Sequence, residues 1–580
     1  MEKEGTQDLT IETERVDDLP VLFAQMEKMG VAELLDEHFV THGNWGGLSL
    51  GKVSVGWLGH ILSQGNHKLN HAEPWAEQHL SMVQTYLDEQ ARALDWSDDH
   101  LARVLDYLGN DEHWDAFEAD LSRRLIRVYD LTPKIVRLDS TSSSSYAQVS
   151  ADGLLQFGQS KDHRPDLPQF KVQLSALDPV GLPVTNTIVS GERADDGLYI
   201  PEIKKVQDVV GRHGLLYLGD CKMAALATRG YLVQSGDFYC MPLSLVQLSE
   251  EQRTELLKPV WEGKQKLEPI QRTNEKGDRE VIARGFSLQR PQEITTEEQS
   301  FCWQEQLLVV RSLKLVAAQE RGLRERLAKA EAEVQGLNVR GRGKQHFRSQ
   351  EQLQEAAHSI VKRYRVEGLL TLCYQEQVEQ RFVRGYGQHE AGIRVEREVS
   401  VQVGIDEEAV AKAIDALGWQ VYATNAPTQL FSLSKLVLAY RSEYLIEHDF
   451  GRLKGQPCSL RPLYLASPHR LIGLVRLLTI ALRVLILVEF EVRQHLAARG
   501  ETLKGLYAGQ PTRATARPTA EKLLRAFNGI TLTKVEQGKE QYWHVTPLSE
   551  VQKVILELLS LPPDLFARVV VASRRLAHAQ

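Results

Sequence analysis

Apolar residues recur every three or four positions through the first 130 residues, which is the spacing of amphipathic helices. Clear examples are VLFAQMEKMGVAELLDEHF, from Val21, and DDHLARVLDYLGNDEHWDAFEADLSRRLI, from Asp98. The spacing predicts an all-α N-terminal domain over residues 1–130. One segment, SLGKVSVGWLGHILSQG, has the length of half a helix-turn-helix, but nothing in it marks a recognition helix, and a plain packing helix accounts for it equally.

From Pro133 the period changes to that of strands and hairpins. KIVRLDSTS is predicted to be a short strand, FKVQLSALD and LPVTNTIVS to be a hairpin joined at PVG, and residues 197–212 to be a helix. Two further apolar strands, GLLYLGD and DFYCMPL, follow. The order strand, hairpin, helix, strand, helix, strand is that of a mixed α/β sheet of the ribonuclease H type. We therefore expect the first part of such a core over 131–243.

The pattern is lost between about Ser244 and Asn425. This stretch contains strand candidates such as CWQEQLLVVRS, a charged helix, LKLVAAQERGLRERLAKAEAEVQGL, and a second hairpin-like passage. Because the helical segment after Leu433 resumes the earlier core, we interpret 244–425 as an inserted β-rich subdomain. Residues 426–500 are then the second part of the core, and 501–580 a helical C-terminal region.

The segment Leu471–Val492 is apolar enough to suggest a membrane span, but Arg476 and Arg483 interrupt it seven residues apart, on one helix face. A buried core helix is the better interpretation, and no membrane partner is expected. The acidic N-terminus lacks the features of a signal peptide, and the five cysteines stand far apart without a C-x-x-C pair. These features favour the reducing cytoplasm.

The bulk charge gives no support to a nucleic-acid partner. The 580 residues carry a formal net charge of −8, with 42% hydrophobic and 25% charged residues. Locally clustered Lys and Arg can still form a phosphate-binding surface while acidic segments elsewhere cancel them in the total.

Two aspartates follow apolar runs that read as strands. Asp139 and Asp220 are 220 − 139 = 81 residues apart, enough for a hairpin and one crossover helix. If the two strands are parallel neighbours, both carboxylates emerge at the same edge of the sheet. Each aspartate alone is equally explained as a turn or a helix cap.

A third acid lies on the segment SLSKLVLAYRSEYLIEHDFGRLKG, in which Tyr440, Glu447 and Lys454 recur every seven residues. In one continuous helix this spacing aligns them along one face, where they could follow a phosphodiester backbone. Glu447 would complete a carboxylate set for hard divalent cations, and Lys454 would reach a neighbouring phosphate. A solvated face of mixed charge explains the same residues.

Several separated motifs together resemble a known family. These are LDST at Asp139, FGQSKDHRPDLPQFKVQLS, YLGDCKMA at Asp220, WQVYATN, YRSEYLIEHDFGRLKG and RPLYLASPHRLIGL. In this order they resemble the DDE transposases of bacterial insertion sequences, in the branch with a long β-rich insertion and a Tyr-Arg-Glu-Lys signature. The resemblance covers roughly residues 95 to 500, and the N-terminal portion resembles the extra domain of that branch, with possible binding of DNA ends.

The resemblance implies that Asp139, Asp220 and Glu447 hold two Mg²⁺ or Mn²⁺ ions, and that Tyr440 and Lys454 contact transposon-end DNA. The arginine of the signature is expected three residues after the tyrosine. Glu443 stands there instead, and Arg441 is the nearest substitute. Glu443 is therefore either a fourth acid near the metals or a sign of an impaired copy.

Basic segments supply further candidates for DNA contact. Lys161, His163 and Arg164, with Lys171, lie on the segment entering the first hairpin, where a salt-bridged turn is the alternative. The most basic local cluster, NVRGRGKQHFR, contributes Arg340, Arg342, Lys344 and Arg348, and a merely solvated loop is its alternative.

The resulting hypothesis is a cytoplasmic, nucleoid-associated transposase. It would cleave double-stranded DNA at terminal inverted repeats and join the freed 3′-OH to target DNA, as a dimer on DNA and with no small-molecule substrate. The rivals are a ribonuclease H-like nuclease that cuts without joining, and a catalytically inactive relative that only binds DNA.

Overall fold

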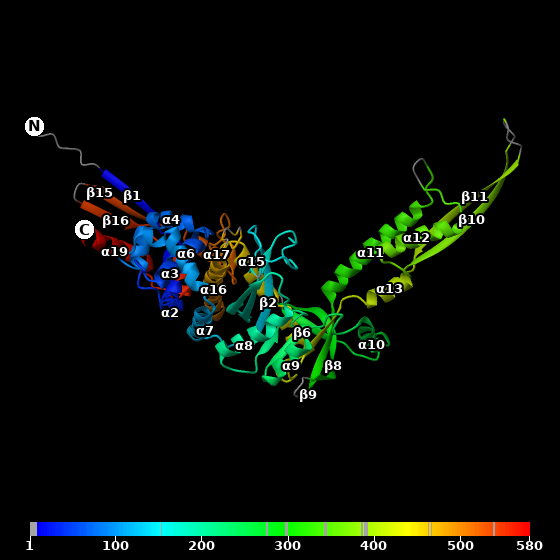
Figure 1. Cartoon of the computed structure of the whole chain (residues 1–580), viewed down its shortest axis with the longest axis horizontal. Coiled ribbons are helices and arrows are strands. Elements are labelled where there is room, and N and C mark those ends of the chain that lie inside the picture. Colours follow the sequence, from blue (N-terminus) through cyan, green and yellow to red (C-terminus); the bar gives the residue numbers. More distant parts are fainter. Residues whose placement is uncertain are drawn as a thin grey trace, which may run out of the picture. The chain divides into compact units, whose positions relative to one another are not determined.

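The computed structural model describes residues 9–151, 153–273, 277–295, 300–341, 345–383, 387, 392–461, 463, 465, 467–537 and 540–579. It divides into two compact units, which we call the core unit (Met1–Met241 with Ala439–Gln580) and the insert unit (Pro242–Leu438) (Figure 1). The segment 244–425, expected to be inserted, lies within the insert unit.

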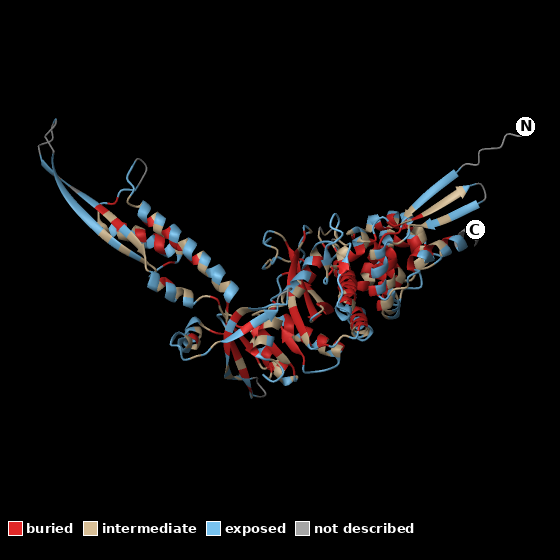
Figure 2. Ribbon diagram, turned by 180° about the vertical axis from the view of Figure 1, so that it is seen from behind, coloured by how far each residue is buried: buried red, intermediate tan, exposed pale blue. Residues whose placement is uncertain are grey.

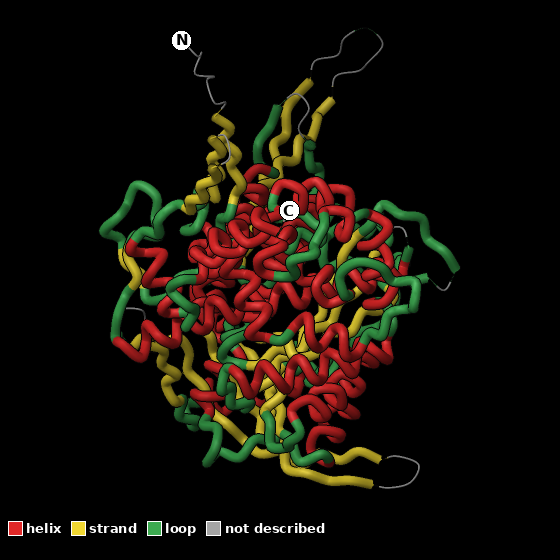
Figure 3. Tube along the Cα trace, turned by 90° about the vertical axis from the view of Figure 1, so that its left-hand side faces the viewer, coloured by secondary structure: helices red, strands yellow, loops and turns green. Residues whose placement is uncertain are grey.

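The N-terminal part of the core unit is helical from Leu19 to Val128. Its α-helices are α1 (Leu19–Met29), α2 (Val31–His38), α3 (Leu50–Gln64), α4 (Ala72–Gln78), α5 (Leu80–Tyr86), α6 (Asp98–Leu108) and α7 (Asp111–Val128). In Figure 3, which faces this side of the molecule, helices make up most of the visible surface. The expectation of a purely helical domain is wrong in one respect, because β1 (Leu9–Arg15) pairs antiparallel with β15 (Thr531–Gln537).

The sheet of the core unit is mixed, in the strand order β4-β3-β2-β5-β6. Its members are β2 (Ile135–Ser144), β3 (Gln169–Leu177), β4 (Leu182–Ser190), β5 (Leu216–Leu218) and β6 (Phe238–Pro242). The predicted hairpin is confirmed as β3 and β4, which pair antiparallel, whereas β2, β5 and β6 run parallel to one another. Helix α8 (Tyr199–Val210) and helix α9 (Leu226–Gln234) connect the parallel strands. The predicted mixed α/β class is therefore confirmed.

Helix α16 (Pro468–Arg499) is the central core helix of this unit. It is long and apolar enough to cross a membrane, but 94% of its most apolar window is buried, and it contacts α3, α6 and β4 (Figure 2). A Cβ atom at Gly473 would lie 2.2 Å from the carbonyl oxygen of Leu105, so the packing of α16 on α6 depends on glycine. The predicted buried helix is confirmed.

The two arginines inside α16 are both paired. The guanidinium of Arg483 donates to Glu118 at 2.5 Å and to the carbonyl oxygen of Pro183 at 2.8 Å. Arg476 donates to Asp111 at 2.5 Å. These partners allow charged side chains within an apolar helix, because a buried charge requires a counter-ion and hydrogen bonds.

The C-terminal region is not only helical, contrary to the expectation for 501–580. Besides α17 (Ala520–Arg525), α18 (Glu550–Leu558) and α19 (Arg568–Ala579) it contains β13 (Leu503–Lys504), β14 (Ala514–Thr515), β15 and β16 (Glu540–Val545). Strand β15 pairs with both β1 and β16. Its partner β1 is more than 500 residues earlier in the chain, so local periodicity could not reveal this sheet.

The insert unit combines strands with a helical hairpin-bearing lobe. Its elements are α10 (Glu250–Trp261), β7 (Glu268–Thr273), β8 (Arg279–Thr295), β9 (Ser300–Ser312), α11 (Leu313–Gly336), α12 (Gln350–Tyr364), β10 (Leu370–Val383), β11 (Gly392–Ile405), α13 (Glu407–Asp415) and β12 (Trp419–Thr424). Strands β12, β9, β8 and β7 are antiparallel neighbours in that order. The predicted charged helix is α11, whose buried Leu323, Leu327 and Val334 pack with α12 and β11 (Figure 1).

Candidate active site

The parallel register of β2 and β5 brings the two aspartates together. Arg137 pairs with Leu218, so Asp139 and Asp220 each lie two residues further along neighbouring strands. The condition that the sequence set, parallel neighbours, is therefore met. One detail differs: Asp139 does not end its strand, because β2 continues to Ser144 and pairs there with β3, whereas β5 stops at Leu218.

Backbone and tyrosine donors fix the carboxylate of Asp220. Its Oδ1 accepts hydrogen bonds from the hydroxyl of Tyr199 at 2.8 Å and from the backbone N–H groups of Lys222 and Met223 at 3.0 and 3.2 Å. Burial and the neighbouring Asp220 raise the pKa of Tyr199, so this phenol stays a hydrogen-bond donor at neutral pH. Tyr199 is a site residue that the sequence did not single out.

Asp139 is half-buried beside other charges. Its side chain is 24% exposed, and its Oδ1 accepts a hydrogen bond from the backbone N–H of Ser140 at 2.7 Å. Burial raises the pKa of Asp139, the nearby Asp220 raises it further, and Lys161 opposes both. An anion kept close to another anion in this way favours binding of a cation.

The predicted single helix from Leu433 to Lys454 is wrong. The chain forms α14 (Leu433–Tyr440) and α15 (Tyr444–Lys454), separated by a turn at 441–443. Tyr440 ends the first helix, so it does not share one helix face with Glu447 and Lys454.

Arg137 explains the break. Its guanidinium donates to the carbonyl oxygens of Ala439 and Tyr440, and it is held by two hydrogen bonds to Asp178, at 2.8 and 2.6 Å. The same carbonyls accept from Ser442 and Glu443 in tight three-residue turns. A charged residue within an apolar strand was the one sequence signal for this contact.

Glu443, not Glu447, lies nearest to the aspartates. Burial raises the pKa of the Glu443 carboxyl, and repulsion from Asp139, Glu447 and Asp220 raises it further, while Arg137 opposes them. Glu447 is exposed on the first turn of α15, one turn beyond Glu443. The structure thus brings Asp139, Asp220 and Glu443 together and leaves Glu447 at the edge of this group.

Lys161, predicted to bind DNA, reaches Asp139. Its ammonium group lies 3.5 Å from Asp139 Oδ1 and donates to the carbonyl oxygen and hydroxyl of Ser140, at 2.5 and 2.9 Å. It also lies 3.9 Å from Asp195.

Asp195 gathers lysines and was not anticipated from the sequence. It accepts hydrogen bonds from Lys171 at 2.7 Å and Lys222 at 2.8 Å. Burial works to raise the pKa of Asp195, but these two hydrogen bonds outweigh it and hold the pKa below its usual range. Lys171 is buried with Asp195, so this ion pair leaves it no free ammonium group for a phosphate.

Lys454 is held by Asp162. The two side chains form an ion pair at 2.8 Å, and Asp162 also pairs with Arg461. Burial and the neighbouring Lys161 lower the pKa of Lys454 to about 8, against the opposing effect of Asp139. Lys454 is therefore close to the acids, as its place on α15 requires.

The remaining predicted DNA contacts are scattered. Arg164 is exposed and pairs with Asp166 at 2.7 Å, as a salt-bridged turn would, and His163 is exposed next to it. Tyr440 and Arg441 are half-buried at the break between α14 and α15. In the insert unit Arg340 pairs with Glu398 at 2.6 Å and Arg348 is exposed, while Arg342 and Lys344 lie outside the described residues.

The donor chemistry of the acids fits a hard divalent cation, because carboxylate oxygens are its preferred ligands. Within the described ranges, however, no three His, Cys, Asp or Glu side chains are gathered closely enough to hold a metal ion. Binding would need the carboxyl groups to close around the ion. The ammonium of Lys161 beside Asp139 already provides positive charge there.

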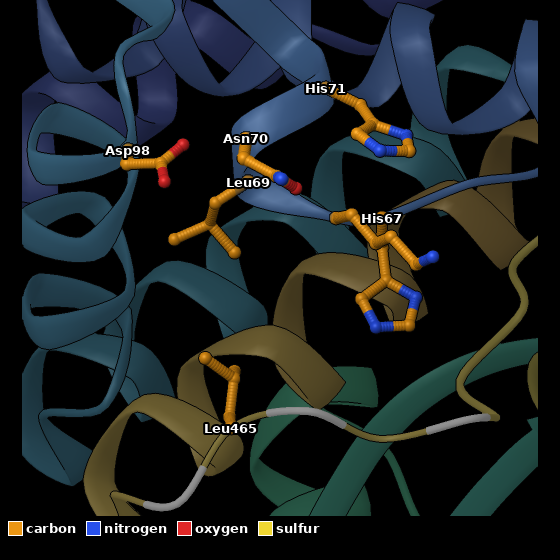
Figure 4. A pocket seen from close by; sticks show the side chains of 7 residues that line it. His67, Leu69, Asn70, His71, Asp98 and Leu465 are labelled. Atoms are coloured by element: carbon orange, nitrogen blue, oxygen red, sulfur yellow. The ribbon is translucent and has the colours of Figure 1, made fainter.

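A cavity of about 480 Å³ lies among the N-terminal helices and is separate from the acids. His67, Leu69, Asn70 and His71 line it with Asp98 and Leu465, as Figure 4 shows. None of the predicted catalytic residues lines it, so the acids form an open site at the sheet and not a pocket.

Comparison with known proteins adds little. No protein-family model matches the chain, and no curated protein does. Among solved structures, a piggyBac transposase synaptic complex with hairpin DNA aligns over 98% of this chain and 87% of that chain, with a TM-score of 0.30 and 7% identity. A likeness at this score does not establish a shared fold or function.

Proposed function

We propose that the protein is a metal-dependent transposase that cleaves DNA at the ends of an insertion sequence and transfers the freed strand to target DNA. The observation that carries the proposal is the placement of Asp139 and Asp220 in one register on neighbouring parallel strands, with a carboxyl from the α14–α15 turn beside them. Convergent carboxylates of this kind are what two-metal phosphoryl transfer requires.

The topology of the core unit supports the same class. The order β4-β3-β2-β5-β6, with an antiparallel hairpin followed by parallel strands, suits a ribonuclease H-like core. In such mixed sheets, ligand sites lie where parallel strands end. Asp139 and Asp220 are placed there.

The roles we assign follow from the contacts. Asp139, Asp220 and Glu447 would hold two Mg²⁺ or Mn²⁺ ions, and Glu443 would be a fourth acid beside them. The ions supply positive charge at the reacting phosphate. Tyr199 keeps the Asp220 carboxylate oriented, and Arg137 holds the turn that carries Glu443. Lys454, Tyr440, Arg441, His163 and Arg164 are proposed DNA contacts, together with the basic segment 340–348.

A supercoiled plasmid carrying the gene with its flanking DNA tests the proposal. We expect Mg²⁺- or Mn²⁺-dependent nicking or excision, and its loss in Asp139→Asn and Asp220→Asn with folding retained. The matched control is Asp166→Asn, which removes an exposed carboxylate paired with Arg164. Retained cleavage in Asp139→Asn would remove this residue from the mechanism.

Strand joining separates the proposal from its rivals. Precut ends bearing a 3′-OH should be joined to target DNA, by a dimer bound to paired ends. Cleavage without joining would identify a nuclease. Tight, salt-sensitive DNA binding without any cleavage would identify an inactive binding protein, which Glu443 in place of arginine would explain. A cytoplasmic, nucleoid-associated location goes with the proposal.

A further inference from the structure

Lys161 holds its ammonium group where an external cation would be expected. It approaches Asp139 to 3.5 Å and is retained by the carbonyl oxygen and hydroxyl of Ser140. Its side chain is 33% exposed, so the group can leave without disturbing a packed core. In the protein without metal it therefore neutralises a half-buried carboxylate that lies beside a second one.

Asp195 offers the same lysine a second acceptor. The Asp195 side chain is 2% exposed, and its Oδ2 lies 3.9 Å from the Lys161 ammonium. Lys171 and Lys222 already bond to Asp195 and fix its position. The Lys161 ammonium thus lies between two carboxylates, one in the proposed metal site and one outside it.

We propose that Lys161 is an internal cation that occupies the metal position at Asp139, and that Asp195 receives its ammonium group when a divalent ion binds. This inference rests on the proposed function. A divalent ion at Asp139 would repel an ammonium group a few ångströms away, because the effective dielectric at a half-buried site screens weakly. Lysine is suited to the movement, since it is a point charge on a flexible four-carbon stem.

Asp195 is therefore a positioning residue for Lys161. Without its carboxylate, the ammonium of Lys161 would have Asp139 as its remaining acidic partner and would compete longer with the metal. With it, the ammonium stays near the site after metal binding and is available to a phosphate oxygen of the DNA.

Mn²⁺ titration followed by electron paramagnetic resonance tests this without any activity assay. Lys161→Met should bind Mn²⁺ on the order of tenfold more tightly than the unaltered protein, because a nearby like charge is removed. Lys161→Arg should stay close to the unaltered affinity. Asp195→Asn should bind several-fold more weakly, and in the Lys161→Met background Asp195→Asn should have no further effect.

Lys205→Met is the matched control, since Lys205 also has a 33% exposed side chain paired with an aspartate. Its Mn²⁺ affinity should not change. Unchanged or weaker binding in Lys161→Met, with binding in the unaltered protein, would overturn this inference and leave the proposed function standing. Binding in neither protein would overturn both. Should Asp195→Asn fail to fold, the comparison of Lys161→Met with Lys161→Arg decides alone.

Discussion

Glu443 places a carboxyl group in a half-buried position where three other carboxyl groups already lie near it. Because burial and this repulsion raise its folded pKa, the folded protein binds the proton more strongly than the unfolded chain does. Its ionisation therefore costs stability as the pH rises above the ordinary glutamate pKa. Glu443→Gln should raise the melting temperature at pH 7.5, by on the order of 1 °C or more, and should give no gain near pH 4.

Cleavage assays separate Glu443 from Glu447. If Glu447 is a metal ligand, Glu447→Gln should abolish cleavage at any Mg²⁺ concentration, whereas Glu443→Gln should retain part of it. The reverse result would make Glu443 the third ligand, as its proximity to Asp139 allows.

Buried histidines among the N-terminal helices predict acid sensitivity. His60 is 3% exposed against Trp75, and burial, with His71 and His79 nearby, lowers its pKa from 6.5 to about 4. Between these values the unfolded chain binds a proton that the folded protein does not, so stability is lost as the pH falls. The shift corresponds to about 3 kcal/mol.

The measurement is urea unfolding of His60→Leu and the unaltered protein at pH 7.5 and at pH 4.5. The unaltered protein should lose more stability between the two conditions than the variant does. Equal losses would show that His60 does not contribute, since acids with raised pKa values are common to both proteins.

At the scale of elements, the break between α14 and α15 depends on Arg137. This side chain and Asp178 are 4% and 8% exposed, so Arg137→Met would leave a buried carboxylate unpaired and two carbonyls without their donor. We expect a loss of about 3–5 kcal/mol in urea unfolding and loss of cleavage, because the turn carrying Glu443 would move. Arg137→Met with Asp178→Leu should recover part of the stability but not the cleavage. Full stability in the single variant would contradict this account.

The contact of α16 with α6 predicts an unusual cost for one methyl group. Gly473→Ala would force a Cβ against the backbone oxygen of Leu105, whereas Gly451→Ala on α15 meets no atom within 4 Å. Alanine normally stabilises a helix interior by about 1 kcal/mol relative to glycine. Thermal unfolding should therefore show destabilisation at position 473 and a neutral or favourable effect at 451. Equal effects would mean that the helices separate easily.

Elements set by local periodicity were predictable from the sequence, and those set by distant contacts were not. The β3–β4 hairpin, α8, α11 and buried α16 follow from the spacing of apolar residues and turn signals. Strands β1 and β15 stabilise each other across most of the chain, and the break at 441–443 is made by an arginine from β2. In the same way the aspartates could be found by their place after apolar runs, whereas Asp195 and Tyr199 are defined only by what packs against them.

At the scale of the whole molecule, the carboxyl groups of the proposed site come from three distant parts of one unit. Strand β2, strand β5 and the turn before α15 all belong to the core unit, although the insert unit separates the third from the first two in the sequence. The central claim is that these three parts bind one set of divalent ions.

Iron-directed cleavage of the polypeptide measures that claim most directly. Fe²⁺ in place of Mg²⁺, with ascorbate and peroxide, cuts the backbone close to the bound ion. The account predicts cuts near Asp139, near Asp220 and within 443–447, all suppressed by excess Mg²⁺ and absent in Asp139→Asn. Cuts confined to other segments, such as the histidines at 67–71, or the absence of cuts at 443–447, would contradict it.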